Sequence, residues 1–279
     1  MRDLRKLLEM RKLVPPDRTR TLILSVFEAA RHLRELVAHV EERQEASTAR
    51  FARELEIAIP KLQASMQEVR RRSEDVMVHR ATSKHEAVVP FLEQVYEDVE
   101  HLVDTAATYA RYQETLRLPV LTQEGLSELR GEVEAKLDLW RAVRDWEQTY
   151  EEWGETRFSQ LDLEVVSQRV NGFVRAALEA ERVLSGSPVV AMLRERVHLF
   201  KATLPVLSNL KCPVFKQRHL AALSHMLGFD VHDATRTLSS VLSRDVVRFA
   251  LPVERIAGEA AGEANLEAAL YSSLLNILC

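Results

Sequence analysis

Histidine and cysteine are the residue types from which this chain could build a metal site. Three histidines, His219, His225 and His232, lie close together in the sequence. Their spacings of six and seven residues do not bring three imidazoles onto one turn of a helix. The chain also has no His-Glu-x-x-His or Cys-x-x-Cys pair for metal binding. We therefore interpret these histidines as separate surface or capping residues, and we expect no metal site.

Glycine and serine patterns can indicate phosphate binding and nucleophilic catalysis. A nucleotide phosphate loop needs glycines whose backbone amides surround the phosphate, followed by a lysine. None of the eight glycines precedes a lysine, and no serine lies in a Gly-x-Ser-x-Gly turn. A catalytic triad is a spatial arrangement that the sequence leaves open. The sequence thus predicts no cofactor, no small-molecule substrate and no ATP binding, and an enzyme is the least favoured interpretation.

The composition of the chain indicates which classes of partner and which cellular compartment to expect. A net charge of −4 gives no general attraction for nucleic acid, and the one basic run, residues 70–72, is flanked by acidic residues as on a solvated helix face. No apolar run approaches the roughly 20 residues that a membrane span needs. Two cysteines, Cys212 and Cys279, cannot form a disulfide framework. We interpret Cys212 as a small buried residue and expect a soluble protein of a reducing, intracellular compartment, without nucleic-acid or membrane partners.

The elements that must position these residues are predicted to be helices throughout. Apolar residues recur three and four apart, and no sustained alternation of period two occurs. In the first part, the pattern predicts helices over residues 22–40, over 51–76 with Pro60 as a kink or boundary, and from a Ser83–Glu86 capping pair to Pro119. The expected fold class is all-α: an elongated bundle of long helices, followed by the shorter helices of a rod.

The second part has shorter and better-punctuated elements. A helix over 126–153 is followed by one capped by Ser159 and Asp162, and residues 185–188 form a break before a helix that reaches Pro205. Pro213 is expected to open a short helix that ends at Gly228, Asp233 to cap the next, and a last helix to begin near Pro252. A composition shift near residues 119–125 suggests two domains, 1–120 and 121–279.

Three tryptophans on one predicted helix could form a binding platform or anchor a core. Trp146 and Trp153 are seven residues apart and share a face, whereas Trp140 points elsewhere. We favour the core interpretation for two of the three and keep an interaction surface as the alternative.

The order of these motifs resembles dynein heavy chains over about residues 109–275. Trp140, Trp146 and Trp153, followed by Phe158-Ser-Gln-Leu161-Asp162, are similar to the start of the family's linker region. The resemblance continues through residues 188–190 and 197–210, which include Pro205, and through Pro213-x-x-Lys216-x-Arg218-His219, Gly228-Phe229, Glu263 and Glu267. Upstream, residues 112–114 resemble the segment before the linker. Leu220 and Ile277 stand where the family has tryptophan.

The resemblance implies a non-catalytic structural and mechanical segment at the tail–linker junction of a microtubule motor, axonemal rather than cytoplasmic in type. Residues 1–120 would be the tail-like long-helix bundle and 121–279 the N-terminal part of the linker. Implied partners are the motor ring and other dynein heavy, intermediate or light chains, in the cytoplasm, the cytoskeleton and the axoneme of a cilium or flagellum. The ATP-binding AAA+ modules would lie outside this chain, as in a fragment, a split gene product or a truncated paralogue. The alternative is a free-standing helical scaffold or adaptor, spectrin-like or tether-like.

Arg218 and His219 are the motif residues for which we predict a specific role. Leu220, Leu223 and Leu227 form the apolar stripe of their short helix, so Arg218 should point outward and His219 should lie at the edge of the stripe. We expect the pair to be structural and to hold this helix against the segment 200–210. A contact to the motor ring or to a partner chain is the rival interpretation.

Overall fold

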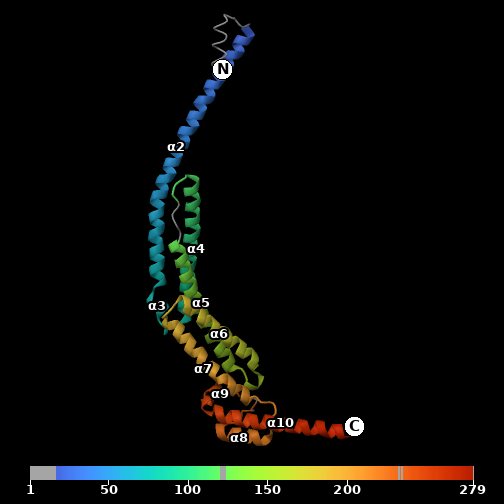
Figure 1. Ribbon diagram of the computed structural model, residues 1–279. Helices are drawn as coiled ribbons and strands as arrows, with labels where there is room; N and C mark the ends of the chain where they lie inside the picture. The colour runs from blue at the N-terminus through green and yellow to red at the C-terminus, as the bar shows by residue number, and fades with distance from the viewer. Residues whose placement is uncertain (1–16, 120–123, 232, 234, 279) are drawn as a thin grey trace. The chain divides into compact units, whose positions relative to one another are not determined.

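The computed structural model describes residues 17–119, 124–231, 233 and 235–278 (Figure 1). Their α-helices are α2 (Asp17–Ser73), α3 (Val76–His79), α4 (His85–Thr115), α5 (Glu124–Glu155), α6 (Leu163–Val183), α7 (Pro188–Leu210), α8 (Gln217–Leu227), α9 (Leu238–Leu242) and α10 (Ala250–Leu278). Two short 3₁₀ helices are η1 (Phe158–Gln160) and η2 (Val246–Phe249). These residues contain no β-strand, so the all-α prediction is confirmed.

The chain divides into two compact units. The first consists of the described residues within 1–64 and 105–122, and the second of residues 65–104 together with the described part of 123–279. Both α2 and α4 therefore contribute to each unit. The predicted division into domains near residue 120 stays a prediction. None of the helices in the described ranges is both long and apolar enough to cross a membrane.

Helix α2 is one uninterrupted helix, whereas the sequence pattern predicts two. Its 57 residues extend for about 85 Å at 1.5 Å per residue. The stretch between the predicted helices, residues 41–50, is rich in Glu, Gln, Arg and Ala, which favour helix, and it contains no glycine or proline. Pro60 lies inside α2 and does not end it. Of the two alternatives at Pro60, the boundary is therefore wrong, because a proline removes one backbone hydrogen bond but need not end a helix. The kink stays a prediction.

In the first unit, the end of α4 lies beside the middle of α2. A groove of about 770 Å³ separates them, and its walls include Phe51 and Leu55 from α2 and Tyr109 and Tyr112 from α4. Leu55 is buried, while Phe51 and Tyr112 are about half exposed. The N-terminal part of α2, blue in Figure 1, extends beyond the end of α4.

The second unit holds a continuous hydrophobic core. Helix α6 packs against α5 and α7, and α10 packs against α7, α8 and η2. The largest fully buried side chains are Trp140 and a set of leucines, among them Leu129, Leu193, Leu207 and Leu210. This core fixes the faces of α5, α7, α8 and α10 that carry the motif residues.

Helix ends in the second unit follow ordinary capping chemistry, with three corrections to the predicted caps. Asp162, rather than Ser159, caps α6 by accepting hydrogen bonds from the amides of residues 164 and 165. Thr237, rather than Asp233, caps α9, because Asp233 accepts its bonds from Thr235. Helix α8 begins at Gln217 rather than at Pro213. Serine, threonine and aspartate are frequent both in loops and at caps, so their presence alone does not locate a helix start.

The other punctuation follows the sequence. Pro188 opens α7, and Gly228 ends α8 in the left-handed conformation with φ 74°. Pro205 lies inside α7, which continues to Leu210, so the predicted end at Pro205 is wrong.

Two backbone segments far apart in sequence are bonded to each other. The amide of Phe158 donates to the carbonyl of Arg236 at 2.8 Å, and the amide of Leu238 donates to the carbonyl of Thr156 at 3.0 Å. Arg157 and Thr237 form the antiparallel bridge between these bonds. The bridge closes the loop that contains α6, α7 and α8.

Candidate functional site

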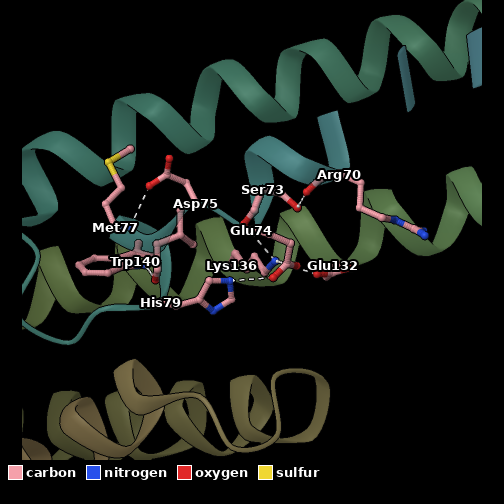
Figure 2. A network of polar contacts seen from close by, with 10 residues as sticks. Arg70, Ser73, Glu74, Asp75, Met77, His79, Glu132, Lys136 and Trp140 are labelled. Carbon is pink, nitrogen blue, oxygen red and sulfur yellow. Dashed lines mark hydrogen bonds and ion pairs between the residues drawn. The ribbon is translucent and has the colours of Figure 1, made fainter. Parts of the chain in front are cut away.

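A buried lysine anchors the end of α2 within the second unit. Lys136 of α5 has a side chain only 4% exposed, and its ammonium group lies 3.1 Å from the carbonyl oxygen of Ser73 and 2.7 Å from a carboxylate oxygen of both Glu74 and Glu132 (Figure 2). An ammonium group has three N–H donors, so all three are used. The carbonyls at a helix C-terminus lack partners within the helix and carry partial negative charge. Lys136 therefore satisfies and neutralises the end of α2.

The chain that follows α2 is held from the same face of α5. Trp140, one turn after Lys136, donates its indole N–H to the carbonyl of Val78 in α3 at 2.9 Å (Figure 2). Asp75 caps α3 by accepting from the amide of Met77 at 2.9 Å. We call residues 73–79 the α2–α3 turn. Two side chains of one helix thus fix both halves of this turn.

The electrostatics of the α2–α3 turn favour the ionised form of Glu74. The hydrogen bond from Lys136 is the main cause that lowers the pKa of Glu74 to about 2, and burial opposes it. His79 adds a second cationic neighbour at 3.0 Å when it is protonated. Since the folded-state pKa is below the ordinary value, Glu74 stabilises the fold above pH 4.5 and loses this contribution as pH falls toward 2.

We predict that Glu74→Gln flattens part of the acid dependence of stability. The wild-type chain should lose about 1–2 kcal/mol more than the variant between pH 4.5 and 2, a figure discounted because half of the Glu74 side chain is exposed. Urea unfolding followed by circular dichroism at a series of pH values measures this difference. Parallel pH profiles of the two proteins would contradict the prediction.

The position of Lys136 within an apolar stripe is a sequence signal that marks it as unusual. Leu129, Val133, Trp140 and Val143 form the buried stripe of α5 at helical spacing, and position 136 falls within it. A lysine inside an otherwise apolar stripe must find partners when it is buried. Periodicity alone could therefore have marked Lys136 as special, although its partners 62 and 63 residues away could not be named.

The three tryptophans are all buried, whereas the core interpretation was favoured for only two of them. Trp146 lies at the centre of an aromatic cluster, with ring centroids 5.3 Å from Phe173, 5.7 Å from Phe200 and 6.4 Å from Trp153. Trp153 stacks on Phe200 at 5.4 Å. These contacts join α5, α6 and α7. Trp140 is turned away from the cluster toward α3, in agreement with its predicted angular offset.

Arg218 and His219 belong to an ion-pair cluster that joins α8 to α10. Arg218 pairs with Glu263, and Lys216 contacts both Glu263 and Glu267. The hydrogen bond from Arg218 is the main cause that holds the pKa of Glu263 below its ordinary value. Five residues of the predicted motifs are thus brought together: Lys216, Arg218, His219, Glu263 and Glu267.

His219 is the buried member of this cluster. Its Nδ1 atom accepts from the backbone amide of Lys216 at 3.2 Å, which caps the start of α8. Its Nε2 atom lies 3.5 Å from Glu263 and 3.4 Å from Nε of Arg218. The capping interpretation of His219 agrees with this geometry. His225 is exposed, and His232 lies outside the described residues.

The partner of Arg218 differs from the expected one. We predicted that Arg218 would hold α8 against residues 200–210 of α7, but its partner Glu263 lies on α10. The outward direction is as predicted, because 63% of the side chain is exposed. A carboxylate 45 positions downstream could not be inferred from local spacing.

We predict that Arg218→Ala has little effect on stability. An exposed ion pair is screened by water, and His219 still caps α8. The melting temperature of the full chain should shift by no more than about 2 °C. A larger drop would mean that the Arg218–Glu263 pair holds α8 in place.

The remaining predicted features are located as follows. Leu223 and Leu227 are buried and Leu220 is partly buried, so the apolar stripe of α8 faces the core. Cys212 is only partly buried. Cys279 and the side chain of Ile277 lie outside the described residues. Among the residues that the structure describes, no group of three or more His, Cys, Asp or Glu side chains could hold a metal ion.

Comparison with known proteins identifies the family. Residues 126–272 match the family model described as dynein heavy chain, N-terminal region 2. Human dynein axonemal heavy chain 6 is 28% identical over 229 residues, which cover 81% of this chain and 6% of the relative. Human dynein axonemal heavy chain 2 is 28% identical over 156 residues, 54% of this chain and 3% of the relative.

A third relative comes from Chlamydomonas reinhardtii. The dynein-1-beta heavy chain of the flagellar inner arm I1 complex of Chlamydomonas reinhardtii is 22% identical over 140 residues, 50% of this chain and 3% of the relative. The chain thus spans no more than 6% of the length of these three relatives. The matched region begins in α5 and ends in α10, so it contains the aromatic cluster and the α8–α10 ion pairs. This chain belongs to the dynein heavy chain family, and its residues 126–272 match that family's N-terminal region 2.

Proposed function

We propose that this chain is a non-catalytic structural segment of an axonemal dynein, which joins the tail to the linker. The observation that carries the proposal is the family match over residues 126–272. Within that region, Trp146 of α5 contacts Phe173 of α6 and Phe200 of α7, and Arg218 of α8 pairs with Glu263 of α10. Such contacts couple the positions of neighbouring helices.

The contacts at both ends of the second unit support a mechanical role. Lys136 and Trp140 fix the α2–α3 turn to α5, and α8 packs against α10 with the ion pairs of Lys216 and Arg218 at the exposed side of that contact. Between them, the aromatic cluster joins α5, α6 and α7 through large rings. A displacement of one helix must disturb several of these contacts together, as a segment that carries load requires.

Capture from ciliated or flagellated cells tests the proposal. The tagged full chain should recover dynein heavy, intermediate or light chains above the level recovered by the tag alone. A Lys216→Glu/Arg218→Glu variant provides a matched control, because both changes are on the exposed side of the α8–α10 cluster. Loss of dynein chains with an unchanged melting temperature would make this surface a partner contact. Recovery of no dynein chain by the wild type would favour a free-standing scaffold instead.

We predict no saturable binding of Mg-ATP by this chain. No glycine precedes a lysine in the manner of a phosphate loop. Isothermal titration calorimetry of the full chain with Mg-ATP measures any binding. A saturable heat with a micromolar Kd would contradict the non-catalytic proposal.

A further inference from the structure

The first half of α2 carries an apolar stripe that lies open to solvent. Its members are spaced alternately four and three residues apart, which is the spacing of a coiled-coil seam. We call them the α2 stripe: Leu22, Val26, Ala29, Leu33, Leu36 and Val40. Leu22, Leu33 and Val40 are 66%, 62% and 59% exposed. A row of this length on one helix face is a surface that needs a partner.

The exposed segment ends where α4 begins to cover the same face. Ser47 and Glu54 continue the spacing of the α2 stripe, seven and fourteen residues after Val40, and they line the groove against the end of α4. Residues 17–43 therefore have the length of about 40 Å available for another helix. In Figure 1 this is the blue part of α2, beyond the end of α4.

The positions of the α2 stripe are symmetric about residue 31. A twofold axis at that point pairs position i with position 62 − i. It places Leu22 opposite Val40, Val26 opposite Leu36, and Ala29 opposite Leu33. An antiparallel second copy of the helix would therefore meet every member of the stripe with another member. Closed twofold interfaces of this kind use the same surface on both copies.

The two edges of the α2 stripe decide between the antiparallel and parallel arrangements. One edge is apolar and the other is polar: Ile23, Ala30 and Val37 on the first, and Ser25, His32 and His39 on the second. In an antiparallel pair each edge contacts the same edge of the second copy, so the apolar edge packs against another apolar edge. In a parallel pair the two kinds of edge would meet, and Val37 would be set against His32. The antiparallel pair buries more apolar surface and leaves the polar edge at the solvent.

The expected interface is large enough for a reversible dimer. Each copy contributes seven large aliphatic side chains and two alanines from the α2 stripe and its apolar edge. At roughly 60–120 Å² for each large side chain, the two copies bury on the order of 1,000 Å² in total. That area lies at the lower end for specific interfaces, so we expect a dissociation constant in the micromolar range.

We infer that residues 17–43 of α2 form an antiparallel homodimer through the α2 stripe. The occupant of this surface is a second copy of the chain, centred on residue 31. The inference does not rest on the proposed role in a dynein, because it concerns association of the purified chain with itself.

Sedimentation equilibrium of the full chain tests the association. The wild type should show a monomer–dimer equilibrium at micromolar concentration, and Leu33→Asp should weaken the dimer at least tenfold. Leu24→Asp is the matched control, since Leu24 is 57% exposed but lies about 200° from Leu22 around the helix. The far-ultraviolet circular dichroism of both variants should remain that of the wild type. A wild-type chain that is monomeric throughout, or equal weakening by both variants, would overturn the inference.

Disulfide trapping tests the direction. In a background of Cys212→Ser and Cys279→Ser, one chain carries Ala29→Cys and another carries Leu33→Cys. Disulfides need Cα atoms within about 7 Å, so the antiparallel pair should link the two variants in a mixture and neither alone. Linking of each variant to itself would show a parallel pair and overturn the assignment. A dynein chain recovered on this surface in place of a second copy would also overturn it.

Discussion

Trp146→Ala should lower the free energy of unfolding by about 3–5 kcal/mol, because it removes a large buried ring and leaves a cavity. The indole is only 3% exposed and contacts the rings of Phe173, Phe200 and Trp153. Natural domains are stable by only about 5–15 kcal/mol, so this loss is a large fraction of the total. Chemical unfolding followed by far-ultraviolet circular dichroism measures it.

Leu199→Ala is the matched control for Trp146→Ala. Leu199 lies on α7 next to Phe200, but 65% of its surface is exposed. Its loss should change stability by no more than about 0.5 kcal/mol. If the two variants unfold at the same denaturant concentration, the aromatic cluster does not hold α5, α6 and α7 together.

Lys136→Met should lower stability by about 2–3 kcal/mol, even though methionine nearly matches the length and shape of the lysine stem. The substitution leaves the carbonyl of Ser73 without its donor and leaves two carboxylates, Glu74 and Glu132, beside an apolar group. The estimate is reduced because about half of Glu74 is exposed. Thermal and urea unfolding of the full chain measure the change.

Two further variants make the Lys136 experiment specific. Lys201→Met changes an exposed lysine on α7 and should have little effect. Adding Glu74→Gln to Lys136→Met should recover part of the loss, because one of the two uncompensated charges is removed. Strict additivity of the two substitutions would mean that Lys136 and Glu74 do not act as a pair.

The helical fold could be predicted because it depends on local periodicity. The stripe of α5 and the break at residues 185–188 are encoded by neighbouring residues, and both are present in the structure. The ends of the helices were harder to predict than the helices themselves. Pro60 and Pro205 lie inside helices, because a proline removes one backbone hydrogen bond without necessarily ending the helix.

The candidate site could be predicted only in part. The motif residues pointed to the region of α8 and α10, and the outward direction of Arg218 followed from its angle on the helix. Its partner Glu263 could not be found in this way, because tertiary packing brings α8 and α10 together. The same reason applies to Lys136, whose position in an apolar stripe was visible but whose contact with the end of α2 was not.

The backbone bridge between residues 156–158 and 236–238 has a consequence for how the second unit opens. Its two hydrogen bonds close a loop that contains α6, α7 and α8, so they break only when the ends of that whole loop separate. The exchange of the Phe158 and Leu238 amide hydrogens with solvent therefore reports a cooperative opening of the loop rather than local fraying. The exchange rates of these two amides therefore measure how often the loop opens. A force that separates residue 157 from residue 237 must break both hydrogen bonds.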